Sequence, residues 1–166
     1  MTQPAPGAIT LFLDFDGVTH PYSAIKAPER MFEAAPLIEA VLREHPEVEV
    51  VLSTSWRESY PLDELRYLFS IDIAERVIGI TPIYSGDRQF PMLPFERSTH
   101  TRHAECQIWL HENRSLDHPW IVIDDMAKWF DEDLPNLLQT NPVTGFVPAD
   151  QERRKRAAIP PLKGSV

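Results

Sequence analysis

The hydrophobic residues of this chain form short uninterrupted runs that alternate with stretches of helical periodicity. Runs at 9–15, 47–53 and 120–123 are rich in Val, Ile, Leu and Phe, which is typical of strands buried on both faces of a parallel sheet. Two shorter runs, at 76–80 and 137–140, predict two further strands. We therefore expect a sheet of five strands.

Apolar residues at helical spacing predict three helices between these strands, one beginning near Pro36, one over 59–69 and one over about 102–112. The proline-containing segments 19–31 and 85–101 have little periodicity and are predicted to be loops. Strands that alternate with helices indicate an α/β fold. We expect a three-layer Rossmannoid with a central, mainly parallel five-stranded sheet.

Composition adds limits to this fold. A chain of 166 residues with 43% hydrophobic content fits one domain, predicted over 1–149, followed by a basic, proline-containing tail over 150–166. The tail is either a helix end with a loose terminus or a contact arm. The formal net charge of −9 argues against a broad nucleic-acid or membrane surface, but it leaves a local basic groove open.

The single cysteine, Cys106, excludes internal disulfides and suits a reducing compartment. No apolar stretch is long enough to span a bilayer, and the first residues lack the basic and apolar regions of a signal peptide. We expect a cytoplasmic protein without a membrane partner.

The first strand ends in two carboxylates, Asp14 and Asp16, followed by Gly17. Residues i and i+2 of a strand point to the same side, so these carboxylates would repel each other unless a cation lay between them. A hard divalent ion, most simply Mg²⁺, is the expected cation. An acidic turn without chemistry is the alternative, whereas an EF-hand is excluded because Val18 and Ile25 occupy ligand positions of that loop.

Polar residues also follow the second and fourth strands. Ser53 and Thr54 end the second, and Asp124 and Asp125 end the fourth. The carboxyl ends of parallel strands are where α/β proteins place their chemistry. A turn-capping hydroxyl and an acidic helix cap are the alternative interpretations. Arg57, beside a tryptophan, would either contact substrate or lie at the rim of the core.

Taken together, Asp-Phe-Asp-Gly at 14–17, Ser-Thr-Ser-Trp-Arg at 53–57 and Ile-Asp-Asp at 123–125 resemble the motifs of the haloacid dehalogenase (HAD) superfamily of phosphohydrolases. The resemblance covers the chain to about residue 147. More narrowly, these segments and Arg-His-Ala-Glu-Cys-Gln-Ile-Trp-Leu at 102–110 are similar to the small HAD domains of bacterial "Swiss army knife" RNA-repair proteins.

This resemblance implies roles for individual residues. Asp14 would be the nucleophile that forms an aspartyl-phosphate, and Asp16 the general acid and then the general base. Ser53 and the backbone N–H of Thr54 would bind the phosphoryl oxygens. The implied Mg²⁺ ligands are Asp14, Asp16 (through its backbone carbonyl), Asp124 and Asp125.

The sequence departs from the family at the cation that faces the phosphate. The family usually has a lysine just before the fourth strand, and this chain has no lysine between Ala27 and Lys128. Arg102 is the predicted replacement, with Arg97 and Lys128 as alternatives and a simple surface charge as a further interpretation of Arg102.

The gaps between the motifs are too short for a separate cap domain, so we expect a capless HAD-like protein with an open site. Such members tend to act on large substrates, and the predicted function is a Mg²⁺-dependent phosphatase for phosphorylated substrates such as RNA or DNA ends. The alternatives are a small-molecule phosphatase acting on nucleotides and a non-catalytic HAD scaffold that binds a partner. The physiological substrate, the oligomeric state and the role of the tail stay open.

Overall fold

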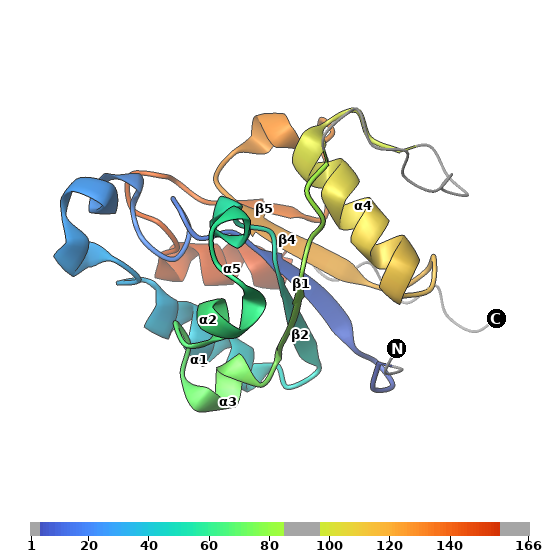
Figure 1. The fold of residues 1–166 in the computed structure, drawn as a ribbon, viewed down its shortest axis with the longest axis horizontal. Helices are drawn as coiled ribbons and strands as arrows, with labels where there is room; N and C mark the ends of the chain where they lie inside the picture. The colour runs from blue at the N-terminus through green and yellow to red at the C-terminus, as the bar shows by residue number, and fades with distance from the viewer. Residues whose placement is uncertain (1–3, 85–96, 157–166) are drawn as a thin grey trace.

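The central element of the protein is a five-stranded, entirely parallel sheet, seen in a computed structural model that describes residues 4–84 and 97–156 (Figure 1). The strand order is β3-β2-β1-β4-β5. The strands are β1 (Ile9–Leu13), β2 (Val48–Leu52), β3 (Val77–Ile80), β4 (Trp120–Asp124) and β5 (Leu137–Gln139). The predicted α/β class and five-stranded parallel sheet are confirmed.

The helices of the described residues are mostly short. They are α1 (Ala35–Glu44), α2 (Leu62–Arg66), α3 (Ile71–Ala74), α4 (Thr101–Asn113) and α5 (Pro148–Arg156), together with the 3₁₀ turns η1 (Tyr22–Lys26), η2 (Pro28–Arg30), η3 (Ser55–Glu58) and η4 (Ala127–Trp129). Two 3₁₀ turns thus lie within the predicted loop 19–31. The other predicted loop covers 85–101, and its residues 85–96 lie outside the described residues.

Of the helix predicted over 59–69, the structure keeps only α2 as an α-helix, and α3 begins beyond that range at Ile71. The start of α3 contacts α1, because the carboxylate of Glu39 accepts hydrogen bonds from the backbone N–H of Ser70 at 2.8 Å and from its hydroxyl at 2.5 Å. These bonds satisfy a backbone donor at the start of a new helix, as a capping side chain would. The start of α3 is therefore stabilised by a residue 31 positions away in the sequence.

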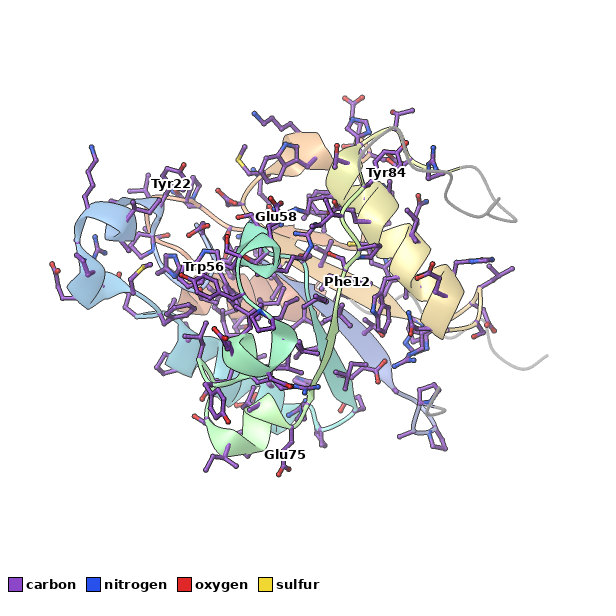
Figure 2. The ribbon with its side chains drawn as sticks, viewed as in Figure 1. Phe12, Tyr22, Trp56, Glu58, Glu75 and Tyr84 are labelled. Carbon is purple, nitrogen blue, oxygen red and sulfur yellow. The ribbon has the colours of Figure 1, made fainter. Side chains whose placement is uncertain are left out.

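Alternate strand residues build the two faces of the sheet, as a period of two requires. Leu11 and Leu13 of β1 pack with Ile38 of α1 in the larger core cluster. Phe12, between them, packs with Trp109 of α4 in the smaller cluster. Figure 1 shows α1–α3 and α4 on different sides of the strands, and Figure 2 shows Phe12 toward the middle of the molecule. The sheet is thus the middle of three layers.

The C-terminal segment 148–156 is helical and contacts β5. The predicted boundary at 149/150 falls inside this helix, so the first turns of the basic segment belong to the same fold. Residues 157–166 lie outside the described residues. Within the described part, no helix is long and apolar enough to cross a membrane.

The strand order determines where the functional groups meet. The chain passes from β1 outward through β2 and β3, and then returns by α4 to β4 on the other side of β1. The order therefore reverses between β1 and β4, which is where open α/β sheets form their binding crevice. Both strands end in aspartates at this point.

Candidate active site

Three carboxylates converge where β1 and β4 end. Leu13 pairs with Ile123 in the sheet register, and the backbone N–H of Asp14 donates to the carbonyl of Ile123 at 3.1 Å. One carboxylate oxygen from each of Asp14, Asp124 and Asp125 lies within 4.8 Å of the other two. Among the described residues this is the one group of three or more acidic, His or Cys side chains close enough to share a metal ion.

Gly17 makes the close approach of Asp125 possible. Its φ angle is +76°, in the left-handed region, and a Cβ atom at this position would lie 2.6 Å from Cγ of Asp125. Any other residue would be strained and would push the carboxylate away. The hydroxyl of Thr140, just after β5, donates to the Gly17 carbonyl at 2.7 Å and holds this turn in place.

Arg102, in the first turn of α4, lies against two of these carboxylates. Its Nη1 atom is 3.3 Å from Oδ1 of Asp14 and 3.3 Å from Oδ2 of Asp124. The guanidinium carbon also lies 4.9 Å from the ring centre of Trp129. Burial disfavours the charge of Arg102, but the neighbouring aspartates outweigh burial and raise its pKa.

The two alternative cations lie elsewhere. Arg97 donates to the hydroxyl of Tyr84 at 2.8 Å. Lys128 is exposed on η4 and does not line the pocket that opens over the carboxylates. Of the three predicted candidates, the structure brings Arg102 to Asp14.

The carboxylates are poorly balanced by this one arginine. Burial raises the pKa of Asp14 to about 6, although Arg102 opposes the shift. Burial, together with repulsion from Asp14, raises the pKa of Asp124 to about 8, and burial also raises the pKa of Asp125. Three buried acids facing one guanidinium form an all-oxygen donor set with excess negative charge, and this arrangement fits a hard divalent cation such as Mg²⁺.

The side chain of Asp16 takes a different direction from that of Asp14. Its Oδ1 is 3.0 Å from Nε2 of the buried His20, and its Oδ2 accepts from the indole N–H of Trp56 at 3.1 Å. These hydrogen bonds lower the pKa of Asp16. The expectation that the two carboxylates lie together is therefore not met. Both line the same pocket, but the carboxylate of Asp16 does not belong to the cluster within reach of one ion.

Ser53 and Thr54 lie buried where β2 ends beside β1. The backbone N–H of Ser53 donates to the carbonyl of Leu13 at 3.0 Å, while its fully buried hydroxyl has no hydrogen-bond partner among the described residues. The hydroxyl of Thr54 accepts from the backbone N–H of Trp56 and caps η3. Neither side chain lines the pocket, whereas that of Ser55, which the sequence did not single out, does.

Arg57 does not reach the pocket. Its guanidinium donates to the carbonyls of Thr54 and Thr81 at 2.7 and 3.0 Å, and it forms an ion pair with Glu105 of α4 at 2.8 Å. The predicted contact with substrate is replaced by a contact within the protein, because the guanidinium points back into the fold and its donors are already used there.

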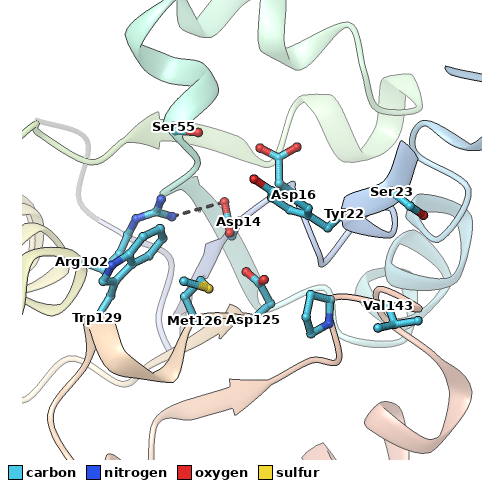
Figure 3. Close-up of a pocket in the computed structure, with 11 residues that line it drawn as sticks. Asp14, Asp16, Tyr22, Ser23, Ser55, Arg102, Asp125, Met126, Trp129 and Val143 are labelled. Carbon is cyan, nitrogen blue, oxygen red and sulfur yellow. Dashed lines mark ion pairs between the residues drawn. The ribbon is translucent and has the colours of Figure 1, made fainter. Parts of the chain in front are cut away.

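A pocket of about 640 Å³ opens over the carboxylates (Figure 3). It is lined by Asp14, Asp16, Tyr22, Ser23, Ser55, Arg102, Asp125, Met126, Trp129, Pro142 and Val143. The apolar residues of this lining were not predicted from the sequence. They come from segments without periodicity, and a sequence carries no signal for two loops that meet in space.

The fold and this site together define an α/β protein of the Rossmann type with an acidic centre at the switch point of its sheet. A family model described as the HAD domain in Swiss Army Knife RNA repair proteins matches residues 10–151. The chain belongs to this family, which supports a HAD phosphohydrolase-type function and confirms the resemblance seen in the motifs. No curated protein and no solved structure matches the chain.

Proposed function

We propose that the protein is a Mg²⁺-dependent phosphatase that works through an aspartyl-phosphate on Asp14, with a nucleic-acid terminal phosphate as the favoured substrate. The observation that carries this proposal is the convergence of Asp14, Asp124 and Asp125 on one point beside Arg102. A structural ion pair would need one acid for one base, so the excess of carboxylates indicates a site built for a cation and an anionic substrate.

Asp14 is the proposed nucleophile. One of its carboxylate oxygens would attack the phosphorus atom, form an oxygen–phosphorus bond and release the substrate oxygen. Its place at the carboxyl end of β1, on the floor of the pocket, supports this role. In the second step water would attack the same phosphorus, break the bond to Asp14 and release inorganic phosphate.

Asp16 is the proposed proton carrier. It would donate a proton to the leaving oxygen in the first step and accept one from water in the second. His20 and Trp56 hold its carboxylate in the pocket wall and lower its pKa. The carboxylate is therefore ionised before the second step, as a group that accepts a proton must be. For the donating role, a bound phosphate dianion would have to raise that pKa by electrostatic repulsion.

Arg102 and the end of β2 are the proposed phosphate-binding groups. The guanidinium would neutralise charge on the transferring phosphoryl group, as arginine does in bidentate contacts. The unpartnered hydroxyl of Ser53 and the backbone N–H of Thr54 would donate to the phosphoryl oxygens. A buried hydroxyl without a partner is costly, and a phosphoryl oxygen would satisfy it; because neither side chain lines the pocket, this contact requires the turn after β2 to move toward the substrate.

Asp14, Asp124, Asp125 and the backbone carbonyl of Asp16 are the proposed Mg²⁺ ligands. When bound, the ion would neutralise the carboxylates and polarise the phosphoryl oxygens.

The decisive experiment measures release of phosphate from an aryl phosphate and from 3′-phosphorylated RNA, with Mg²⁺ and with chelator. We expect Mg²⁺-dependent hydrolysis that Asp14→Asn abolishes, while Asp63→Asn, which changes an exposed acid on α2, keeps full activity. A higher kcat/KM for free nucleotides than for RNA ends would favour the small-molecule alternative. Inactive wild-type protein across metals and substrates would contradict the proposal and favour the scaffold.

A further inference from the structure

One side of the pocket is an exposed apolar wall that the chemistry at Asp14 does not use. Tyr22 of η1 is 60% exposed, and Val143, in the loop after β5, is 73% exposed. Both line the same pocket as Asp14 and Asp16. Figure 3 shows Tyr22 and Val143 on the other side of the carboxylates from Arg102 and Trp129.

The two loops that form this wall are tied together by their backbones. The N–H of Tyr22 donates to the carbonyl of Pro142 at 2.8 Å, and the N–H of Phe146 donates to the carbonyl of Val18 at 2.7 Å. Gly145, with a φ angle of +69°, passes so close that a Cβ would lie 2.9 Å from the Val18 carbonyl oxygen. The backbone that carries Tyr22 is therefore held at the pocket before any ligand arrives, which lowers the entropy cost of binding.

The aromatic rings around the site are not equivalent. Trp129 lies under the guanidinium of Arg102, and Trp56 packs against Phe15 and Phe32 while it donates to Asp16. Tyr22 has no ring or cation packed against it among the described residues, and Figure 2 places it toward the edge of the molecule. An exposed ring beside a polar site gains free energy when a flat apolar group covers it.

The pocket has room for such a group together with a phosphate. A volume of about 640 Å³ is within the range of sites that hold one small organic ligand. Stacking on an aromatic side chain is the usual way in which proteins bind a nucleobase without reading its sequence.

We infer that Tyr22 determines the specificity of this site, and that the substrate is a nucleoside phosphate whose base stacks on the Tyr22 ring beside the phosphate. This inference rests on the proposed function for the position of the phosphate at Asp14 and Arg102. The nucleoside phosphate is either the terminal nucleotide of a strand or a free nucleotide.

The test compares two 3′-phosphorylated oligonucleotides that differ only in whether the terminal residue carries a base, and a free nucleoside 3′-phosphate. The variants are Tyr22→Ala, Tyr22→Phe and the matched control Tyr67→Ala, which removes a tyrosine that is 88% exposed on the α2 side. We expect Tyr22→Ala to raise KM about tenfold for both substrates that carry a base and to leave the abasic end unchanged. Tyr22→Phe keeps the ring and should stay within about twofold of wild type.

A second measurement separates this inference from the proposed function. In the Asp14→Asn background, calorimetry with Mg²⁺ measures the Kd of the nucleoside 3′-phosphate with and without Tyr22→Ala. A roughly tenfold weaker Kd supports the inference even if the wild type hydrolyses nothing. Hydrolysis that is insensitive to Tyr22→Ala, or a loss that is equal for abasic and base-carrying ends, overturns the inference and leaves the phosphatase proposal standing.

Discussion

Arg57 and Arg102 are both buried arginines, and both form an ion pair with an acid, yet they serve different parts of the molecule. Arg57 lies in η3 and donates to backbone carbonyls, and among the described residues its ion-pair partner is Glu105 at 2.8 Å. Arg102 lies one turn before Glu105 on α4 and forms ion pairs with Asp14 and Asp124, each at 3.3 Å. Only Arg102 lines the pocket.

The difference lies in how completely the donors are used. Arg57 ties the segment after β2 to the segment after β3 and to α4, because its donors reach Thr54, Thr81 and Glu105. Burial lowers the pKa of Arg57 and raises that of Glu105, so burial outweighs the attraction within this pair. Arg102 keeps longer contacts and faces the pocket. A guanidinium whose N–H donors are all used within the protein stabilises the fold. A guanidinium that contacts two carboxylates at longer distance can exchange these contacts for a phosphate.

The largest expected effect comes from removing Arg57. Arg57→Ala leaves Glu105 buried without its cation and leaves several carbonyls without donors, and such a loss costs about 3–5 kcal/mol of the free energy of unfolding. Urea unfolding followed by circular dichroism measures this change. A loss below about 1 kcal/mol would contradict the structural role given to Arg57.

Arg102→Ala should affect catalysis more than folding. If Arg102 stabilises charge on the phosphoryl group, kcat/KM falls by about 10²–10³-fold, or about 2.7–4 kcal/mol in the barrier. In Mg²⁺ its unfolding free energy should fall less than that of Arg57→Ala. Arg102→Lys keeps the charge without the planar fork and should recover part of the rate. Equal rates for wild type and Arg102→Ala would place the phosphate contact elsewhere.

Removal of the proposed Mg²⁺ should lower the free energy of unfolding by an amount that depends on pH. The pKa values of about 6 for Asp14 and about 8 for Asp124 in the folded protein lie above the ordinary value of 3.8. Without metal, the contribution of these two acids to the free energy of unfolding is therefore fully present below pH 3.8. It is lost as pH rises through 6 and 8. If Mg²⁺ binds the ionised acids, as proposed, it should restore about 2.7 kcal/mol at a concentration a hundredfold above its Kd.

Thermal melting at pH 8 and at pH 5, with Mg²⁺ or with chelator, measures this effect. We expect Mg²⁺ to raise Tm at pH 8 and to have little effect at pH 5. The Mg²⁺ effect should survive in Arg57→Ala and disappear in Asp124→Asn. An equal rise in Tm at both pH values would indicate that Mg²⁺ binds outside this cluster.

The smallest effect is expected for an exposed arginine. Arg43 of α1 is exposed; it contacts the exposed Asp72 at 2.7 Å, where solvent screens the charges, and the buried Glu39 at 3.2 Å, which keeps its hydrogen bonds from Ser70. Arg43→Ala should leave unfolding and activity close to those of wild type. A stability loss comparable to that of Arg57→Ala would show that burial is not what separates these arginines.

Much of the fold was predictable because buried strands carry a strong local pattern. The run that forms β1 has apolar residues on both faces, which only a sheet covered on both sides tolerates. The short helix α3 was not predicted, because Glu39 of α1 supplies the hydrogen bonds at its start. Local periodicity carries no record of such a distant partner.

The candidate site was predictable in its acids and less so in its surroundings. Asp14, Asp124 and Asp125 stand out because each follows a buried strand. The direction of Asp16 was missed because it depends on His20 and Trp56, neither of which has a signal that marks it as a partner. Arg102 was predicted to face the aspartates from the resemblance, whereas the inward direction of Arg57 was missed because it depends on the carbonyl of Thr81 and on Glu105.

The sequence alone thus determined the parallel sheet and the strand ends at which the aspartates gather, because strand burial and residue alternation are local properties of the chain. Tertiary structure alone decided that Arg57 points away from the pocket, where the carboxylate of Asp16 points and which loops line the pocket. Those outcomes depend on the distances between segments that lie far apart along the chain, and these distances exist only once the sheet and its helices have packed.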